Sequence, residues 1–444
     1  MKYSSLFLVV LLSLFVYIYT GQLVQFVSIG IFYIIGITVI RLFLKPNNSL
    51  VYGVYGFFFF IYGVLALLSQ IELIHNIDTD YFIHNDASDA FFPHAMKFGA
   101  DNKDNLIETT LLNPFFYDYP LVAFINCGLA RIANTLHVEN IRFFLRIYIF
   151  MISAIIPAII TTLLLEYKVN KKFIIKNVCI FGLVSYLYVT STVFTRDIHV
   201  CLFYTLIFYI LLQPSPHNVI FKFIILFLLC LGARPENGIY SIVFFLSYYL
   251  INKKNNINIS FFVLLFLVAI VLMYGLRDVF DEAVDTAIRY QHSTSHKSVG
   301  TFSAIYTLPF PLNVIGVSIY MILMPLPIDA YIVGNGKSFL TLPFVLSPYL
   351  MLVVFSSSVW YIINRFKTEK KYSIALIVAI LTFFVVSYLS PDIRRSFAVV
   401  PGLYMGYCLI RNKVSVIFLR KIKYIGWPLI AFVNLLFYLL VRVY

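Results

Sequence analysis

The chain has 444 residues, of which 61% are hydrophobic and only 12% are charged, and its mean hydropathy is +0.90. Soluble globular proteins carry roughly 45–50% apolar residues, so this composition excludes a water-soluble protein, a disordered chain and a disulfide-rich secreted module. We expect an all-α integral membrane protein, because helices satisfy their own backbone hydrogen bonds inside a bilayer.

Long apolar runs recur from one end of the sequence to the other. We expect about 13 transmembrane helices in a single transmembrane domain over residues 1–444, because a run of about 20 apolar residues crosses a bilayer. The first run lacks a cleavage site and is expected to be an uncleaved anchor. The runs are 4–20, 22–43, 50–73, 143–165, 173–194, 198–213, 218–235, 237–252, 257–276, 340–363, 372–390, 396–411 and 425–441.

Clusters of basic residues predict the orientation, because Lys and Arg favour the cytoplasmic side of a membrane. If all the clusters are cytoplasmic, the segments 120–136 and 305–327 do not cross. They then belong to two long outer loops, 74–142 and 277–339, and are expected to form in-plane or re-entrant helices. The clusters lie within 168–176, 253–254, 365–371 and 411–423.

The net charge of +13 follows largely from this orientation. Under the predicted topology, Glu166 and Glu369 are the only acidic residues on the cytoplasmic side, whereas basic residues are abundant there. The positive charge therefore indicates orientation and contact with anionic membrane lipids. It does not indicate a nucleic-acid surface.

The first outer loop carries an acidic stretch after residue 74. Asp86 and Asp89 are three residues apart and would share one face of a helix. One of them could take a proton from a sugar hydroxyl as a general base. Alternatively, Asp78 and Asp80 could join them in a divalent-metal site. The remaining alternative is a solvated acidic loop with no chemical role.

Two helix-breaking hairpins place arginines at the outer ends of predicted spans. Arg196 stands directly before Asp197, and Arg234 stands before a Pro-Glu-Asn-Gly segment. An arginine at membrane depth is costly unless it meets an anion, and its planar guanidinium group suits phosphate oxygens. The alternative is an internal ion pair that closes the hairpin, either Arg234 with Glu236 or Arg196 with Asp197.

The second outer loop and the last outer hairpin add further cationic groups. Arg289, His292 and His296 are spaced to form one stripe of a helix, which fits a phosphate clamp. His292 is also a candidate base, since imidazole titrates near neutral pH. Arg394 and Arg395 follow a proline in the last outer hairpin. Together these sites favour one substrate cavity that opens toward the outer leaflet.

In layout the chain resembles the Wzy-type polysaccharide polymerases, which belong to the GT-C group of membrane glycosyltransferases. The likeness covers most of the chain and includes an amphipathic stretch from Tyr119 to Asn134. The family's arginine–glycine loop motif has no clear match, Arg289 and Gly300 being the nearest pair. The residues that carry the resemblance are Asp86, Asp89, Arg196, Asp197, Arg234, Pro235, Arg394 and Arg395.

The resemblance implies that the protein joins undecaprenyl-pyrophosphate-linked oligosaccharide repeats into O-antigen or capsular polysaccharide. The reaction would take place at the periplasmic face of the bacterial inner membrane. Both the donor and the acceptor would be lipid-linked glycans, with a chain-length regulator and a flippase as further partners. The acceptor hydroxyl would lose its proton to Asp86, Asp89 or His292. The residues that would bind pyrophosphate are Arg196, Arg234, Arg289, Arg394 and Arg395.

We expect no cofactor and no nucleic-acid partner. A metal ion is not required, because guanidinium groups can stabilise the charge that develops on the pyrophosphate.

Two other functions fit parts of the sequence. One is a GT-C glycosyltransferase that adds a single sugar from a polyprenyl-phosphate donor, in which Asp86 would carry more weight than the arginines. The other is a polysaccharide flippase. Transporters often show internal repeats, whereas this chain shows none and has two long outer loops, which favours a catalytic face.

Overall fold

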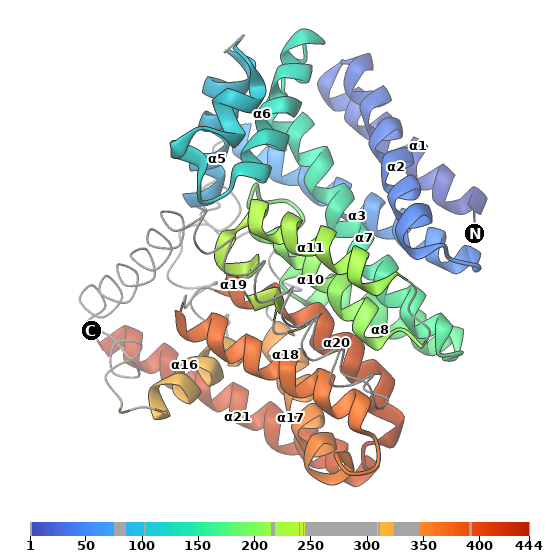
Figure 1. Cartoon of the computed structure of the whole chain (residues 1–444), viewed down its shortest axis with the longest axis vertical. Helices are drawn as coiled ribbons and strands as arrows, with labels where there is room; N and C mark the ends of the chain where they lie inside the picture. Colours follow the sequence, from blue (N-terminus) through green and yellow to red (C-terminus); the bar gives the residue numbers. More distant parts are fainter. Residues whose placement is uncertain are drawn as a thin grey trace.

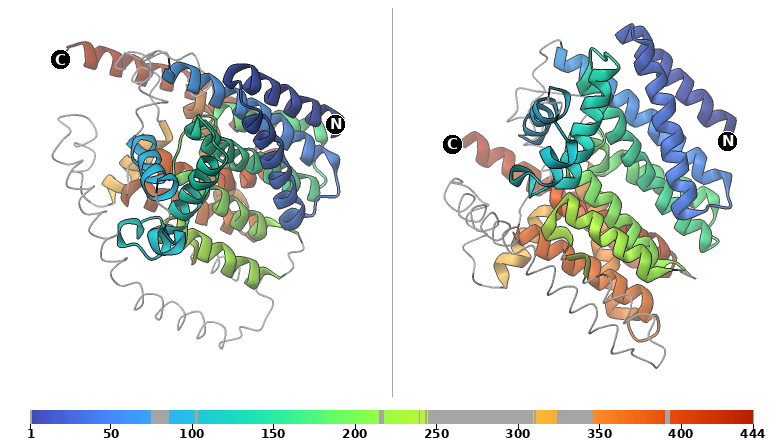
Figure 2. Two further views of the ribbon diagram at one scale, coloured as in Figure 1. Left: turned by 90° about the horizontal axis from the view of Figure 1, so that it is seen from above. Right: turned by 45° about the horizontal axis from the view of Figure 1, so that its top comes forward.

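The computed structural model describes residues 2–74, 86–101, 104–214, 218–238, 240–242, 244, 309, 311–323, 346–389 and 393–443. Across these residues the regular structure is entirely helical, as the composition predicts. The N-terminal helices lie along one side of the molecule and the C-terminal helices along the other (Figure 1 and Figure 2). Helices α10 (Asp197–Leu212) and α11 (Val219–Ala233) lie between them.

Among the residues that the structure describes, five helices are long and apolar enough to cross a membrane. These helices, with the apolar composition, indicate a helical membrane protein. The predicted count of about 13 spans and the side that each loop faces stay predictions. The five are α2 (Leu23–Leu44), the Ser49–Ile71 part of α3 (Ser49–Ile74), α7 (Ile141–Glu166), α17 (Ser347–Arg365) and the Lys370–Tyr388 part of α18 (Lys370–Leu389).

The N-terminal part of the bundle is built around α7. Helix α3 packs along α7, and α1 (Lys2–Thr20) and α2 pack against this pair. Gly21 (φ 69°) makes the turn from α1 to α2, and Lys45 (φ 44°) makes the turn from α2 to α3. Almost every residue of α7 is buried, which is why its sequence is apolar around the whole helix rather than on one face.

The predicted span 173–194 is not one helix, and this prediction is wrong in detail. Helix α8 (Lys171–Val184) ends at Ser185, whose backbone is extended (φ −77°, ψ 170°). The backbone N–H of Leu187 then donates to the Ser185 hydroxyl at 3.3 Å, and a short helix, α9 (Leu187–Thr190), begins there. A serine that bonds the local backbone competes with helix continuation, so the helix breaks inside an apolar run.

The segment between α3 and α7 leaves and returns at the same end of the bundle. Arg146 near the start of α7 donates to Ser69 and Gln70 near the end of α3, at 3.4 and 3.3 Å. In the described part of this segment, residues 86–101 and 104–140, the elements are two α-helices, two π-helical turns and one 3₁₀ turn. They are α5 (Asp86–Ala95), η1 (Met96–Ala100), η2 (Ile107–Leu111), η3 (Pro114–Phe116) and α6 (Pro120–Thr135).

The C-terminal half is a second group of packed helices. Helix α16 (Leu312–Leu323), inside the predicted segment 305–327, packs on α17 and α18. Helix α20 (Val400–Ile410) packs between α10 and α18, while the long α21 (Val416–Val443) packs on α17. The short α19 (Ile393–Phe397) and the turn η6 (Arg411–Lys413) lie at opposite ends of α20.

Three of the predicted basic clusters lie at one end of the bundle, opposite to the α5–α6 segment. Lys371 donates to the backbone oxygen of Gln213 at 2.9 Å, and Arg411 donates to Asn177 at 3.3 Å. The hydroxyl of Tyr209 donates to Glu166 at 2.6 Å. These contacts place residues 166–171, 212–214, 365–370 and 411–415 at a common end.

Candidate functional site: a buried arginine–carboxylate cluster

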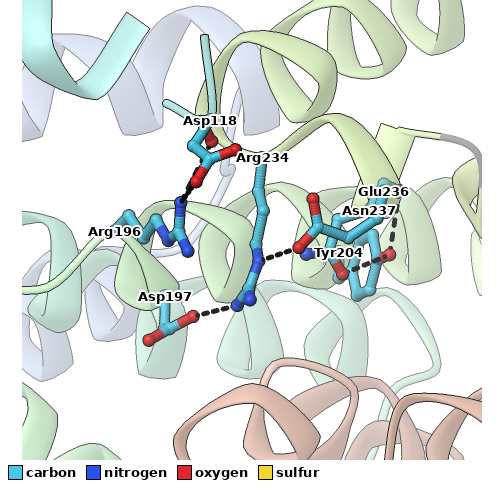
Figure 3. Close-up of polar contacts among 7 residues, drawn as sticks. All are labelled: Asp118, Arg196, Asp197, Tyr204, Arg234, Glu236 and Asn237. Atoms are coloured by element: carbon cyan, nitrogen blue, oxygen red, sulfur yellow. Dashed lines mark hydrogen bonds and ion pairs between the residues drawn. The ribbon is translucent and has the colours of Figure 1, made fainter. Parts of the chain in front are cut away.

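Two of the predicted arginines meet where helices α10 and α11 break. Asp197 is the first residue of α10, and Arg234 follows directly on the last residue of α11. Because the two helices run in opposite directions and pack together, both residues lie at the same end of the pair. Figure 3 shows the resulting cluster, in which Asp118, Arg196, Asp197, Arg234 and Glu236 face one another.

Arg234 is the central residue of this cluster. Its backbone is extended (φ −167°, ψ 109°), which turns the chain out of α11, and its side chain is 2% exposed. The Nη1 atom donates to Asp197 Oδ1 at 2.9 Å, and Nε donates to Glu236 Oε1. The planar guanidinium thus links two carboxylates from different elements, which a single ammonium group could not reproduce.

Arg196 is held more loosely than Arg234. Its Nη1 donates to the backbone oxygen of Asp118 at 3.1 Å and lies 3.9 Å from the carboxylate Oδ2 of the same residue. The guanidinium also lies 5.5 Å from the centre of the Tyr119 ring, in cation–π geometry. Neither Nε nor Nη2 of Arg196 bonds to any residue that the structure describes, so these donors remain available.

The segment after Arg234 is held by buried contacts to α10. The hydroxyl of Tyr204, which is fully buried, lies 2.9 Å from the backbone oxygen of Asn237 and 3.0 Å from its side-chain oxygen. The Asn237 N–H bonds to the backbone oxygen of Arg234 at 3.0 Å. These bonds satisfy backbone groups that the helix break would otherwise leave without partners.

Counted over the described residues, the formal charge of the cluster is negative. Two guanidinium groups meet three carboxylates, those of Asp118, Asp197 and Glu236. Burial raises the pKa of Glu236, but the nearby Arg234 and Arg196 lower it by more, so the pKa lies below its ordinary value. Glu236 is therefore ionised at neutral pH, and an incoming anion would compete with it for Arg234.

The internal ion pair considered for Arg234 forms, but the one considered for Arg196 does not. Arg234 donates hydrogen bonds to both Glu236 and Asp197. Arg196 contacts Asp118 instead of its neighbour in sequence. The two arginines are nevertheless brought together at one end of the α10–α11 pair.

The other predicted site residues are placed only in part. Asp86 and Asp89 begin α5, and Arg394 lies in α19, but their side chains are outside the described part of the structure. Arg395 is half-buried and lies close enough to Tyr240 for an electrostatic interaction. Tyr240 interacts in the same way with Arg234 and Glu236. The remaining predicted residues, Arg289 and His292, lie outside the described residues, as do Asp78 and Asp80.

The sequence prediction missed two buried polar residues. His199, two positions after Asp197, is buried, and its Nε2 lies 3.1 Å from the Tyr148 hydroxyl. Arg146 is fully buried, and its Nε and Nη2 atoms have no partner among the described residues. A cation inside the apolar run 143–165 was a readable signal, because ionisable residues within spans usually face protein or a polar cavity.

Tyr119 joins the cluster to the segment before α6. Its hydroxyl lies 3.1 Å from Nδ1 of His94, whose ring packs edge-on against Phe115. Burial is the main reason that the pKa of Tyr119 is raised to about 12, so the phenol stays protonated. Through Tyr119 and Asp118, the α5–α6 segment contacts Arg196, which places the acidic helix α5 and the arginine cluster at the same end of the bundle.

The cluster thus offers two guanidinium groups, ionised carboxylates and a neutral phenol at a helix break. Such a set can bind an anion or hold a loop closed, and it can do so without a bound metal ion. No protein-family model, curated protein or solved structure matches the chain.

Proposed function

We propose that the protein is a membrane glycosyltransferase of the Wzy type. It would join undecaprenyl-pyrophosphate-linked oligosaccharide repeats into O-antigen or capsular polysaccharide at the periplasmic face of the bacterial inner membrane. The observation that supports this most is the meeting of Arg196 and Arg234 at helix breaks, because guanidinium groups at membrane depth suit the pyrophosphate of a lipid-linked substrate. The lipid tail would stay in the bilayer while its head group reached the cluster.

In the reaction, an acceptor hydroxyl oxygen bonds to the anomeric carbon of the donor. The bond between that carbon and the pyrophosphate oxygen breaks, and undecaprenyl pyrophosphate leaves with the electron pair. The hydroxyl proton passes to a base, for which Asp86, Asp89 and His292 are the candidates. Hydrogen-bond donors of the protein lower the barrier if they bind the leaving group more strongly as negative charge develops on it.

The geometry favours different roles for the two arginines. Arg196 has donors that no described residue uses, so it is the better candidate for direct contact with a phosphate oxygen. Arg234 is bonded to Asp197 and Glu236, so we assign it to positioning the hairpin and to adding positive charge nearby. Arg395 would extend the site from α19, whereas Arg289 and Arg394 stay as predicted contributors.

The test is mass spectrometry of lipid-linked glycans in a deletion strain. One complete repeat accumulating on lipid would support a polymerase, and loss of polymer should be restored by the intact gene. A truncated repeat would instead indicate a transferase of a single sugar, and complete repeats trapped on the cytoplasmic side would indicate a flippase. Either result would refute the proposal.

Complementation with variants then tests the site. Arg196→Gln should abolish or shorten the polymer while the protein is made and inserted at normal levels. Arg420→Gln is the matched control, because Arg420 is an exposed arginine near the start of α21, at the opposite end of the bundle. Full-length polymer with Arg196→Gln would remove this residue from the mechanism.

A further inference from the structure

A second polar site lies far from the arginine cluster, at the turn between α2 and α3. A cavity of about 950 Å³ opens there beside the N-terminal part of α1. Arg41 from the last turn of α2 and Lys45 from the turn itself both line it, together with the hydroxyl-bearing residues Tyr33, Ser49 and Tyr52. The cavity belongs to the end of the bundle that carries the basic loops.

No described residue of the cavity lining compensates its positive charge. None of the described residues that line it is acidic, and the first acidic residue of the whole sequence is Glu72. Neither Arg41 nor Lys45 forms an ion pair with any residue that the structure describes, and both are exposed. Helix α3 begins at Ser49 on the cavity wall, so the partial positive charge of its N-terminus adds to the two cations.

The chemistry of the lining fits a phosphate group. Guanidinium and ammonium groups bind phosphate oxygens by charge-assisted hydrogen bonds, and the tyrosine and serine hydroxyls and an amide from Asn48 supply further donors. A phosphate could belong either to a soluble ester or to the head group of a membrane lipid.

The surroundings favour the lipid. Leu6, at the edge of the cavity, is 55% exposed, and Leu42, next to Arg41, is 67% exposed. Ile34, which is 63% exposed, lies two turns before Arg41 on the same side of α2. An acyl chain leaving the cavity would therefore run along apolar side chains, which a soluble ester would not need.

We propose that this cavity binds the head group of an anionic phospholipid, with Arg41 and Lys45 holding the phosphate. The inference is independent of the glycosyltransferase proposal, since it concerns other residues at the other end of the bundle. The bound lipid would fix the α1–α2–α3 unit in the leaflet that faces the basic loops.

The experiment uses the purified full chain in mixed micelles that contain equal amounts of phosphatidylglycerol and phosphatidylcholine. Native mass spectrometry should detect phosphatidylglycerol retained in preference to phosphatidylcholine. The double variant Arg41→Gln, Lys45→Gln should weaken this retention roughly twenty-five-fold, because each basic side chain near an anionic lipid surface contributes about fivefold. The control Lys421→Gln, Lys423→Gln removes the same charge from exposed positions in α21 and should keep the lipid bound.

Several outcomes would overturn the proposal. Equal loss of phosphatidylglycerol in both double variants would show that retention depends only on the general surface charge. Unchanged retention in the Arg41→Gln, Lys45→Gln variant would show that the cavity is not the binding site. Displacement of the lipid by millimolar inorganic phosphate would identify a site for soluble phosphate instead. The variant Arg41→Lys, Lys45→Arg preserves both charges and should retain the lipid. Loss in that variant would mean that charge at the cavity does not hold the lipid.

Discussion

Removing the guanidinium of Arg234 should destabilise the protein strongly, and the structure sets the expected size of the effect. In Arg234→Met, the Asp197 side chain, which is only 10% exposed, loses the ion pair described above. Removing one partner of a buried ion pair typically costs about 3–5 kcal/mol. Glu236 is 30% exposed and can be hydrated, so we expect its loss of the same partner to add little.

A matched change at Arg196 should cost much less. Arg196 lies 3.9 Å from the Asp118 carboxylate, which is 40% exposed. Ion pairs of that kind contribute about 0–1 kcal/mol. The contrast between Arg234→Met and Arg196→Met therefore separates the two roles, because both changes remove one guanidinium from the same cluster.

The assay is the free energy of unfolding in detergent micelles, followed by circular dichroism as the fraction of denaturing detergent rises. Combining Asp197→Asn with Arg234→Met should recover part of the loss, with a coupling of about 0.5–3 kcal/mol between the two changes. Arg234→Lys should stay destabilised, because one ammonium group cannot bridge two carboxylates. The reasoning would be refuted if the two single methionine variants were equally stable, or if the effects of Asp197→Asn and Arg234→Met simply added.

Three further predictions use other described residues. Arg146→Met should raise the melting temperature measured in micelles. The reason is that apolar packing replaces a fully buried guanidinium that makes two long hydrogen bonds to neutral groups. A lower melting temperature would mean that Arg146 holds an anion. Burial and the charge of Lys97 lower the pKa of His94, so the folded state favours neutral imidazole. Stability from His94 is then complete above about pH 6.5, the unfolded value, and is lost as the pH falls below it. A His94→Gln variant should lack this acid sensitivity in melting curves recorded between pH 8 and 5, and identical curves would contradict the assignment. The topology can be tested with a membrane-impermeant thiol reagent. Asn47→Cys should react with it only after the cells are opened, whereas Glu139→Cys should react in intact spheroplasts. The reverse pattern would invert the predicted orientation.

The sequence predicted the long helices well because length and hydropathy alone decide them. The runs 22–43, 50–73 and 143–165 end within a few residues of α2, α3 and α7. The run 173–194 failed because hydropathy does not register a serine that bonds its local backbone. Ser185 interrupts an apolar stretch without making it polar, so the break between α8 and α9 leaves little trace in the pattern.

The site was predicted at the level of which residues gather, but not of which ones pair. Proline, glycine and arginine together at Arg234 indicated a helix break with a buried cation, and the same argument placed Arg196 nearby. The partners depend on packing between elements far apart in sequence. Asp197 reaches Arg234 across the contact of α10 with α11, while Arg196 contacts Asp118, which lies 78 positions earlier. Adjacent residues at a helix start point in different directions, so neighbours in sequence such as Arg196 and Asp197 need not pair.

The pairing pattern has a consequence for how the cluster could act on a pyrophosphate. Among the described residues, three carboxylates surround the two guanidinium groups, so an anionic substrate that approaches Arg234 must compete with the carboxylates bonded to it. The exposed carboxylates are the ones that can yield: Asp118 and Glu236 can each turn toward water, whereas Asp197 stays against Arg234. Binding of the intact donor is then weakened by this competition, while the extra negative charge that appears on the leaving group draws the guanidinium groups away from Asp118 and Glu236. An interaction that is stronger in the transition state than in the ground state is the kind that accelerates a reaction. Under the proposed function, the surplus carboxylate is therefore compatible with catalysis and limits how tightly the product pyrophosphate is held.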